Sequence, residues 1–236
     1  VDRPKPELTE KINQSSVSKI VMLPDGSKVV LEKNSKITYL TAFNNLSKRK
    51  LYLSGTALFE VHKNPAKPFL VFTNGLITEV LGTKFIIHSI DSGKKVSVEV
   101  ISGIVSVYSF IDKGSNEETG HKKLNSLILT VNQKASYSGE DKTLMASIVS
   151  NPVVVSTQPI NFRYENTSID SVFKSIEQAY GINIIYDEKS LAKRTFTATL
   201  ATETMFEKMD IICKALNARY EIIDGKIAVN PNVVNQ

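Results

Sequence analysis

The stretch from Ile20 to Val61 constrains the fold more than any other part of this chain. Its apolar residues alternate with polar ones in short runs that end at turn residues, without helical spacing. A period of two places every second side chain on the same face of a strand. Asp25-Gly26 separates the first two runs and can supply the positive φ of a tight hairpin turn. Gly55 interrupts a later run, as a β-bulge or a close backbone approach requires. The stretch therefore predicts a series of short strands.

The same alternation continues as far as Val155, so residues 19–155 are expected to form an all-β domain. Short apolar runs separated by Gly, Asn and Asp turns are typical of a sandwich, a barrel or a β-roll, and the pattern does not choose among them. Residues 112–123 are polar with two glycines and predict a mobile loop. Residues 1–18 are polar, contain Pro4 and Pro6, and predict a tether.

After Val155 the spacing of apolar residues becomes helical. Two helices are expected from about residues 169 and 205, because each follows a capping sequence, Thr167-Ser168-Ile169-Asp170 and Thr204-Met205-Phe206-Glu207. Gly181 should end the first helix, and Asp224-Gly225 should turn a closing hairpin. Segments 179–187 and 215–224 resemble each other, which indicates two strand–helix–strand units. Residues 159–236 are therefore predicted to form a small α/β domain after a mainly β fold.

Composition excludes several classes of site. Cys213 is the sole cysteine, so no intramolecular disulfide or cysteine metal cluster can form, and its helical position predicts a buried thiol. The net charge of +5 is spread along the chain, and its densest basic cluster, residues 47–50, lacks the interleaved aromatics of a nucleic-acid site. No run of apolar residues approaches the roughly 20 residues that a membrane-spanning helix needs.

The sequence predicts a protein that is not an enzyme and has no catalytic, cofactor-binding or metal-binding residues. His62, His88 and His121 are scattered, without the spacing that would make them neighbouring ligands. A nucleophile elbow, a phosphate loop and a dinucleotide fingerprint are all absent. Gly82-Thr83-Lys84 has the ending of a phosphate loop, but the earlier glycine is missing and a strand pattern follows it.

The opening stretch resembles the periplasmic domain of FecR-type sigma-factor regulators. The matching positions are Leu23 to Ser27 (LPDGS), Ser35, Tyr39, Arg49, Gly55-Thr56-Ala57, Phe59, Val61, Pro68-Phe69 and Val80 to Phe85. Glu32 and Thr56 stand where that family usually has Asn and Glu. The C-terminal region resembles the small domain that follows FecR domains in Bacteroidetes proteins. That domain is similar to the short N-terminal fold of secretins and TonB receptors. The positions that match it are Phe162, Ile169, Tyr180-Gly181 and Leu216.

The resemblance implies the extracytoplasmic, periplasmic region of a single-pass inner-membrane anti-sigma factor. Such a protein receives a signal from the N-terminal signalling domain of an outer-membrane TonB-dependent transducer and relays it to an ECF sigma factor. The sigma factor would be held by a cytoplasmic segment, which the resemblance places with one membrane helix before this region. A glycan-binding module is an alternative from another class, although the lack of Trp and the buried phase of most aromatics disfavour stacking on sugars. A structural β-module at the cell envelope is a third possibility.

A receiver of this kind needs a surface that its own fold does not occupy. The final hairpin ends in Lys226, Ile227, Ala228 and Val229, and a terminal strand often lies at a sheet edge. These four residues are therefore predicted to bind the partner by strand addition, with Lys226 preventing self-pairing. The alternative is that this strand lies in the middle of its sheet.

Overall fold

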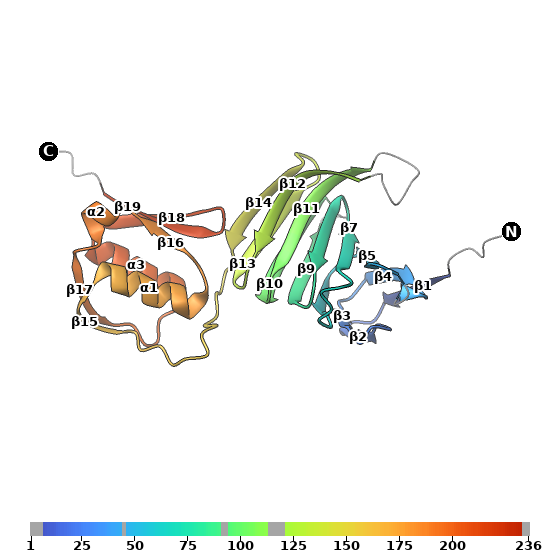
Figure 1. The fold of residues 1–236 in the computed structure, drawn as a ribbon, viewed down its shortest axis with the longest axis horizontal. Coiled ribbons are helices and arrows are strands. Elements are labelled where there is room, and N and C mark those ends of the chain that lie inside the picture. The colour runs from blue at the N-terminus through green and yellow to red at the C-terminus, as the bar shows by residue number, and fades with distance from the viewer. Residues whose placement is uncertain (1–6, 44–45, 91–93, 113–120, 233–236) are drawn as a thin grey trace. The chain divides into compact units, whose positions relative to one another are not determined.

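The computed structural model describes residues 7–43, 46–90, 94–112 and 121–232. It divides into two compact units, which comprise residues 1–130 with 134–145 and residues 131–133 with 146–236. Figure 1 shows the first unit as strands alone and the second as a mixture of strands and helices. A mainly β chain with an all-β part followed by a small α/β part confirms the predicted fold class.

The all-β unit contains two sheets, each of seven strands in the described residues. The first sheet has the order β1-β4-β5-β7-β8-β11-β12, and the second has the order β14-β13-β10-β9-β6-β3-β2. Their strands are β1 (Leu8–Asn13), β2 (Lys19–Met22), β3 (Lys28–Leu31), β4 (Ser35–Leu40), β5 (Arg49–Ser54), β6 (Ala57–Glu60), β7 (Phe69–Thr73), β8 (Leu76–Val80), β9 (Lys84–Ile90), β10 (Lys95–Ser102), β11 (Val105–Asp112), β12 (His121–Leu129), β13 (Gln133–Ser138) and β14 (Thr143–Ile148). Most neighbouring strands are antiparallel, as in the pairs β4–β5 and β7–β8, whereas β5 and β7 are parallel.

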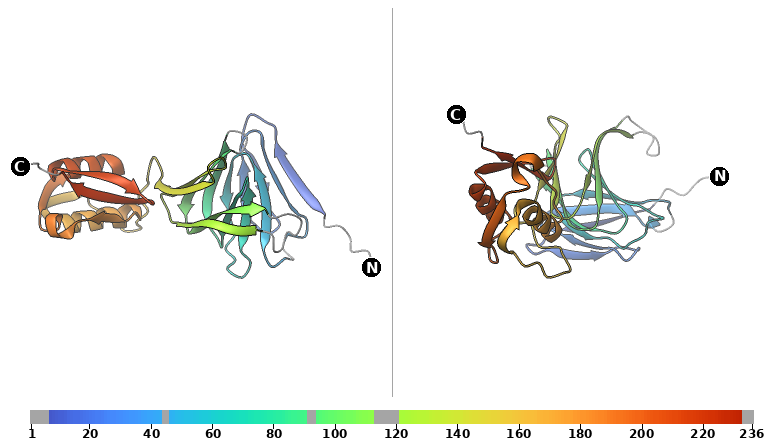
Figure 2. Two further views of the ribbon diagram at one scale, coloured as in Figure 1. Left: turned by 90° about the horizontal axis from the view of Figure 1, so that it is seen from above. Right: turned by 60° about the vertical axis from the view of Figure 1, so that its left-hand side comes forward.

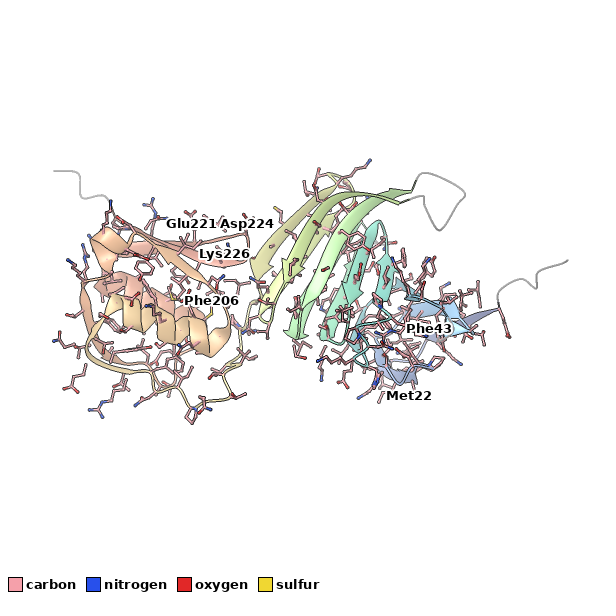
Figure 3. All side chains as sticks on the ribbon, in the orientation of Figure 1. Met22, Phe43, Phe206, Glu221, Asp224 and Lys226 are labelled. Carbon is pink, nitrogen blue, oxygen red and sulfur yellow. The ribbon has the colours of Figure 1, made fainter. Side chains whose placement is uncertain are left out.

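Aromatic side chains join the two sheets into a sandwich. The ring of Phe59 on β6 lies 5.0 Å from that of Phe85 and 6.2 Å from that of Phe69 on β7. Phe43, labelled in Figure 3, packs edge-on against Phe69 at 5.7 Å. All four rings are fully buried. Burial alternates along β3 and β4, as the period of two predicted, because one face of each strand meets this core.

A buried ion pair ties the turn between β2 and β3 to the start of β5. Arg49, which is 1% exposed, donates from Nη1 to Oδ2 of Asp25 at 2.7 Å. It also donates to the carbonyl oxygens of His62 at 2.9 Å and Lys67 at 2.8 Å, and its guanidinium lies over the ring of Phe69. One side chain therefore holds three chain segments and an aromatic ring in place.

Ser27 extends this network. Its backbone N–H and hydroxyl donate to the two carboxylate oxygens of Asp25, and its hydroxyl accepts from the N–H of His62. Gly26 has φ +83°, so the Asp25-Gly26 dipeptide forms the predicted tight turn. The residues of the LPDGS motif are thus fixed by hydrogen bonds rather than by apolar packing alone.

Gly55 is required by a close approach, as the sequence indicated. A Cβ at this position would lie 2.4 Å from Oγ of Ser35, and the φ of +99° disfavours any other residue. Ser35 uses that hydroxyl to accept from the N–H of Thr56 at 2.8 Å. The contact joins β4 of one sheet to the segment that enters β6 of the other.

The structure corrects the predicted tether and the bounds of the predicted loop. Residues 8–13 are not a tether, because they form β1, which pairs with β4 from Leu8↔Leu40 to Asn13↔Ser35. Asn13 is fully buried and donates to the carbonyl oxygens of Val17 and Leu31. The two ends of the loop predicted at 112–123 belong instead to the β11–β12 ladder, in which Asp112 pairs with His121. Residues 1–6 and 113–120 lie outside the described part of the chain.

The α/β unit consists of two strand–helix–strand units and a final strand. Its elements are β15 (Arg163–Ser168), α1 (Ile169–Tyr180), β16 (Ile184–Tyr186), α2 (Glu188–Leu191), β17 (Thr195–Thr199), α3 (Met205–Ala215), β18 (Ala218–Ile223) and β19 (Lys226–Pro231). β15 pairs with β17, and a separate sheet has the order β16-β19-β18. Helices α1 and α3 lie beneath that three-stranded sheet in Figure 1, and the view from above in Figure 2 shows the β18–β19 hairpin in front of them.

Both helices begin where the capping sequences predicted. Ser168 caps α1, and Thr204 forms a complete capping box with Glu207 at the start of α3. Gly181 ends α1 with φ +67°, and Asn217 after α3 has φ +49°, so the internal repeat uses one left-handed residue after each helix. The described residues contain no helix with the length and apolarity needed to cross a bilayer.

Segments before residue 159 contribute to this unit. Ile148 is buried in its apolar core, and the N–H of Val155 donates to the carbonyl of Ala179 at 2.8 Å. Asn132, with φ +64°, donates to the carbonyl oxygens of Val153 and Tyr180, both at 2.8 Å. The compact unit therefore begins earlier than the predicted boundary, and independent folding of 159–236 remains a prediction.

We expect Arg49→Ala to lower the free energy of unfolding of the all-β unit by about 3–5 kcal/mol, because it leaves the Asp25 carboxylate buried without its cation. Lys36→Ala is the control. It removes an exposed cation 3.1 Å from Glu10 and should cost at most about 1 kcal/mol. Urea denaturation of the full chain measures both. Equal losses of unfolding free energy in the two variants would show that the buried ion pair contributes no more to stability than the exposed one.

We expect fragments 159–236 and 146–236 both to unfold cooperatively, with the longer one about 1.5–3 kcal/mol more stable because it buries Ile148. Ile148→Ala in the longer fragment should remove most of the difference. Thermal unfolding followed by circular dichroism tests this. A gradual loss of signal in both fragments would contradict an independent α/β unit.

Candidate functional site

The four residues predicted to dock a partner do not lie at a sheet edge. Lys226, Ile227, Ala228 and Val229 belong to β19, which pairs in parallel with β16 and antiparallel with β18. Ile227 and Val229 are buried within the core of the α/β unit. Strand addition to β19 is therefore wrong, because the last strand inserts between two earlier ones and both of its edges are already occupied.

The edges of this sheet are β16 and β18. β16 has three residues, whereas β18 has six and presents a longer row of backbone groups. Two-residue turns place a hydrogen-bonded pair beside the turn, here Ile223 and Lys226 across Asp224-Gly225. Counted from the turn, every second residue pair of β18 and β19 is then hydrogen-bonded. Asn217 and Asn232 form such a pair, and the N–H of Asn232 does donate to the carbonyl of Asn217 at 2.9 Å.

The same alternation identifies the backbone groups of β18 that have no strand partner among the described residues. Glu221 lies in a hydrogen-bonded pair with Ala228, so its N–H and C=O point toward β19. Ile227 donates instead toward β16, to the carbonyl of Asn183 at 2.9 Å, which confirms that its partner Ile222 is turned the other way. The N–H and C=O groups of Ala218, Tyr220 and Ile222 therefore face the open edge.

A groove of about 730 Å³ runs beside this edge. Helix α3 contributes Asp210, Cys213 and Lys214 to it, and β18 contributes Ala218 to Ile222. Tyr220 lies on the helix side of the strand, where burial and the carboxylate of Asp210 raise its pKa to about 12, so its hydroxyl stays protonated and donates to Asp210. Burial likewise raises the pKa of the Cys213 thiol to about 11, which agrees with the expected inert, buried cysteine.

The opposite face of β18 carries alternating charge. Arg219 and Glu221 are exposed on the face away from the helices, and Glu221 accepts from Nδ2 of Asn230 at 3.2 Å. Figure 3 shows Glu221 on the β18–β19 hairpin with Asp224 and Lys226. Ile222 and Ile223 are 38% and 48% exposed at the end of the strand. An edge of this kind can accept another strand, and its charges restrict which strand fits.

Among the described residues, no group of three or more His, Cys, Asp or Glu side chains is placed to hold a metal ion. A hollow of about 310 Å³ lined by Asp25, Arg49 and His62 coincides with the network that stabilises the sandwich. In Gly82-Thr83-Lys84, Thr83 donates to the carbonyl of Ile104 and Lys84 starts β9, so this segment is structural.

Two family models match the chain in the two units described above. Residues 12–106 match the family described as FecR protein, and residues 161–229 match the one described as FecR, C-terminal. No curated protein matches.

Two solved structures have a related fold. They are crystal structures, at 2.50 Å and 1.65 Å, of a "putative anti-sigma factor" from Parabacteroides distasonis ATCC 8503, with TM-scores of 0.52 and 0.51. Each is 21% identical in sequence to this chain. The matches cover 96% and 95% of this chain, respectively, and 100% of each solved chain. At this identity the likeness establishes the shared fold.

We expect Ile222→Pro to be tolerated and Glu221→Pro to be harmful, although the two positions are adjacent. Proline at 222 removes an N–H that faces the open edge, whereas proline at 221 removes one that bonds to β19 and leaves a partner unpaired. The difference in the free energy of unfolding should be about 1–3 kcal/mol, measured by thermal denaturation of the full chain. Equal destabilisation would show that the edge is assigned to the wrong residues.

Proposed function

Because the chain belongs to the FecR family, we propose that it is the extracytoplasmic receiver region of a transmembrane anti-sigma factor. In this proposal it lies in the periplasm as part of an inner-membrane protein. It receives a signal from a TonB-dependent outer-membrane transducer and relays it to an ECF sigma factor held by a cytoplasmic segment. The presence of both family domains in one chain, each on its own compact unit, supports this role.

The observation that carries the receiving step is the open edge of β18 with its groove. A receiver must bind a partner without losing its own fold, and an edge strand can do so because its outward N–H and C=O groups are not used internally. The signalling domain of a transducer, expected by family resemblance to have a similar small α/β fold, could supply a strand of its own. The docking site is thus proposed at β18, one strand away from the residues that the sequence indicated.

This role requires no covalent chemistry. The FecR family is regulatory, and the output would be a changed interface or a changed susceptibility to proteolysis. Absence of turnover on glycosides, esters and phosphates remains a prediction, and a rate lost on mutating one carboxylate or histidine would contradict the proposal.

The expected partner can be tested directly. Isothermal titration calorimetry of the full chain with the signalling domain of a TonB-dependent receptor encoded beside it should give saturable binding. Ile222→Lys should weaken binding at least about tenfold, because it places a charge against an incoming apolar strand. Ile185→Lys on β16, where the native side chain is 53% exposed, introduces the same charge at the other edge and should leave affinity unchanged.

Circular dichroism confirms that both variants are folded before titration. Equal effects of the two substitutions would contradict docking at β18. Failure of the wild-type chain to bind any neighbouring transducer would contradict the receiver role itself.

A further inference from the structure

The charge pattern of β18 is complementary to itself. Arg219 and Glu221 lie two residues apart on the same exposed face, with Tyr220 between them on the other face. If two copies of β18 run antiparallel with Tyr220 opposite Tyr220, Arg219 of each copy meets Glu221 of the other. From these residues we propose that the open edge of β18 pairs with β18 of a second copy of this chain, around a two-fold axis at Tyr220.

The backbone geometry fits this register. The groups that face the open edge belong to Ala218, Tyr220 and Ile222, so Tyr220 would exchange two hydrogen bonds with Tyr220 of the second copy. Ala218 would pair in the same way with Ile222. Arg219 and Glu221 then fall at non-hydrogen-bonded pairs, where the side chains of opposed residues are closest. Opposite charges therefore stabilise the strand pair more here than at the intervening positions, and like charges destabilise it more.

The side chains fit on the inner face as well. Ala218 is small and 8% exposed, whereas Ile222 is large and 38% exposed. Each exposed isoleucine would lie opposite the alanine of the other copy, beside the groove that α3 borders. The pairing would thereby cover an apolar side chain that the isolated unit leaves in water.

Charge also favours this register over the registers centred on Arg219, Glu221 and Ile222. A two-fold axis at Arg219 would oppose two arginines, and an axis at Glu221 would oppose two glutamates. An axis at Ile222 would place each Glu221 opposite Ile223 and leave both carboxylates without a cation. The register at Tyr220 satisfies all four charges of the two strands.

This pairing uses the edge that the proposed function assigns to the transducer, although it does not depend on that function. A second copy on β18 would be the resting arrangement, and an incoming strand would have to displace it. One strand pair gives a small interface, so the dimer should be weak and reversible.

Sedimentation velocity of the full chain, from about 1 μM to about 500 μM, measures the pairing. The wild type should show a concentration-dependent dimer. Arg219→Glu and Glu221→Arg should each raise the dimer dissociation constant at least about tenfold, because each puts two like-charge pairs into the interface. Lys226→Glu makes the same change in net charge as Arg219→Glu but lies on central strand β19, and it should leave the constant unchanged.

Two further experiments, each of which should restore dimerisation, make the test specific to this register. The double variant R219E/E221R swaps the charges within each strand and should dimerise as the wild type does. An equimolar mixture of the two single variants should form a heterodimer, since one copy then presents two glutamates and the other two arginines. A misfolded variant could give neither result, and circular dichroism checks each protein separately.

Each other outcome overturns the proposal. A wild type that stays monomeric over the whole range has no such pairing. A dimer that both single variants leave intact uses another surface. Weakening by the single variants without recovery in the mixture shows that Arg219 and Glu221 do not meet. Calorimetry with the transducer domain on the monomeric single variants tests the receiver role separately, so the two proposals can fail independently.

Discussion

The buried ion pair between Arg49 and Asp25 is the interaction on which the all-β unit depends. Arg49 starts a strand of one sheet, whereas Asp25 lies in a turn between two strands of the other. The same guanidinium binds the carbonyl oxygens of His62 and Lys67, which lie between β6 and β7. A slip of β5 by one residue would turn Arg49 to the opposite face and leave Asp25 buried without its cation. The apolar core supplies most of the burial, but this network specifies how the strands align.

In the α/β unit the corresponding constraint is the insertion of β19. The first strands of the two repeated units pair with each other, while their last strands, β16 and β18, do not meet. β19 fills the space between them, using Ile227 and Val229 to complete the core above the helices. Its insertion satisfies one side of β18 and leaves the other side open. The position of the open edge therefore follows from where the final strand enters.

These two constraints together describe a protein suited to regulation by contact. One unit is a sandwich held by buried polar bonds, and the other presents an incomplete sheet beside a groove. The unpaired backbone groups of an edge strand can pair with strands of other chains, and charged side chains on the edge commonly limit such pairing. We propose that Arg219 and Glu221 have this role on β18, because a strand without complementary charges would pair poorly. The same two residues make the edge selective for particular strands, including its own.

The sequence by itself determined the local elements, the family and the division into a β part and an α/β part. Alternation located the strands, Gly26, Gly181 and Asp224-Gly225 located turns, and Thr204 with Glu207 located the start of α3. These features depend on neighbours within a few residues, which the sequence displays directly. Only the tertiary structure decided that residues 8–13 form a strand and that β19 is central rather than at an edge. Strand order depends on pairing between residues far apart in the chain, and alternation is the same in a central strand as at an edge. The open edge at β18, where we propose that a partner docks, could not be located from the sequence for that reason.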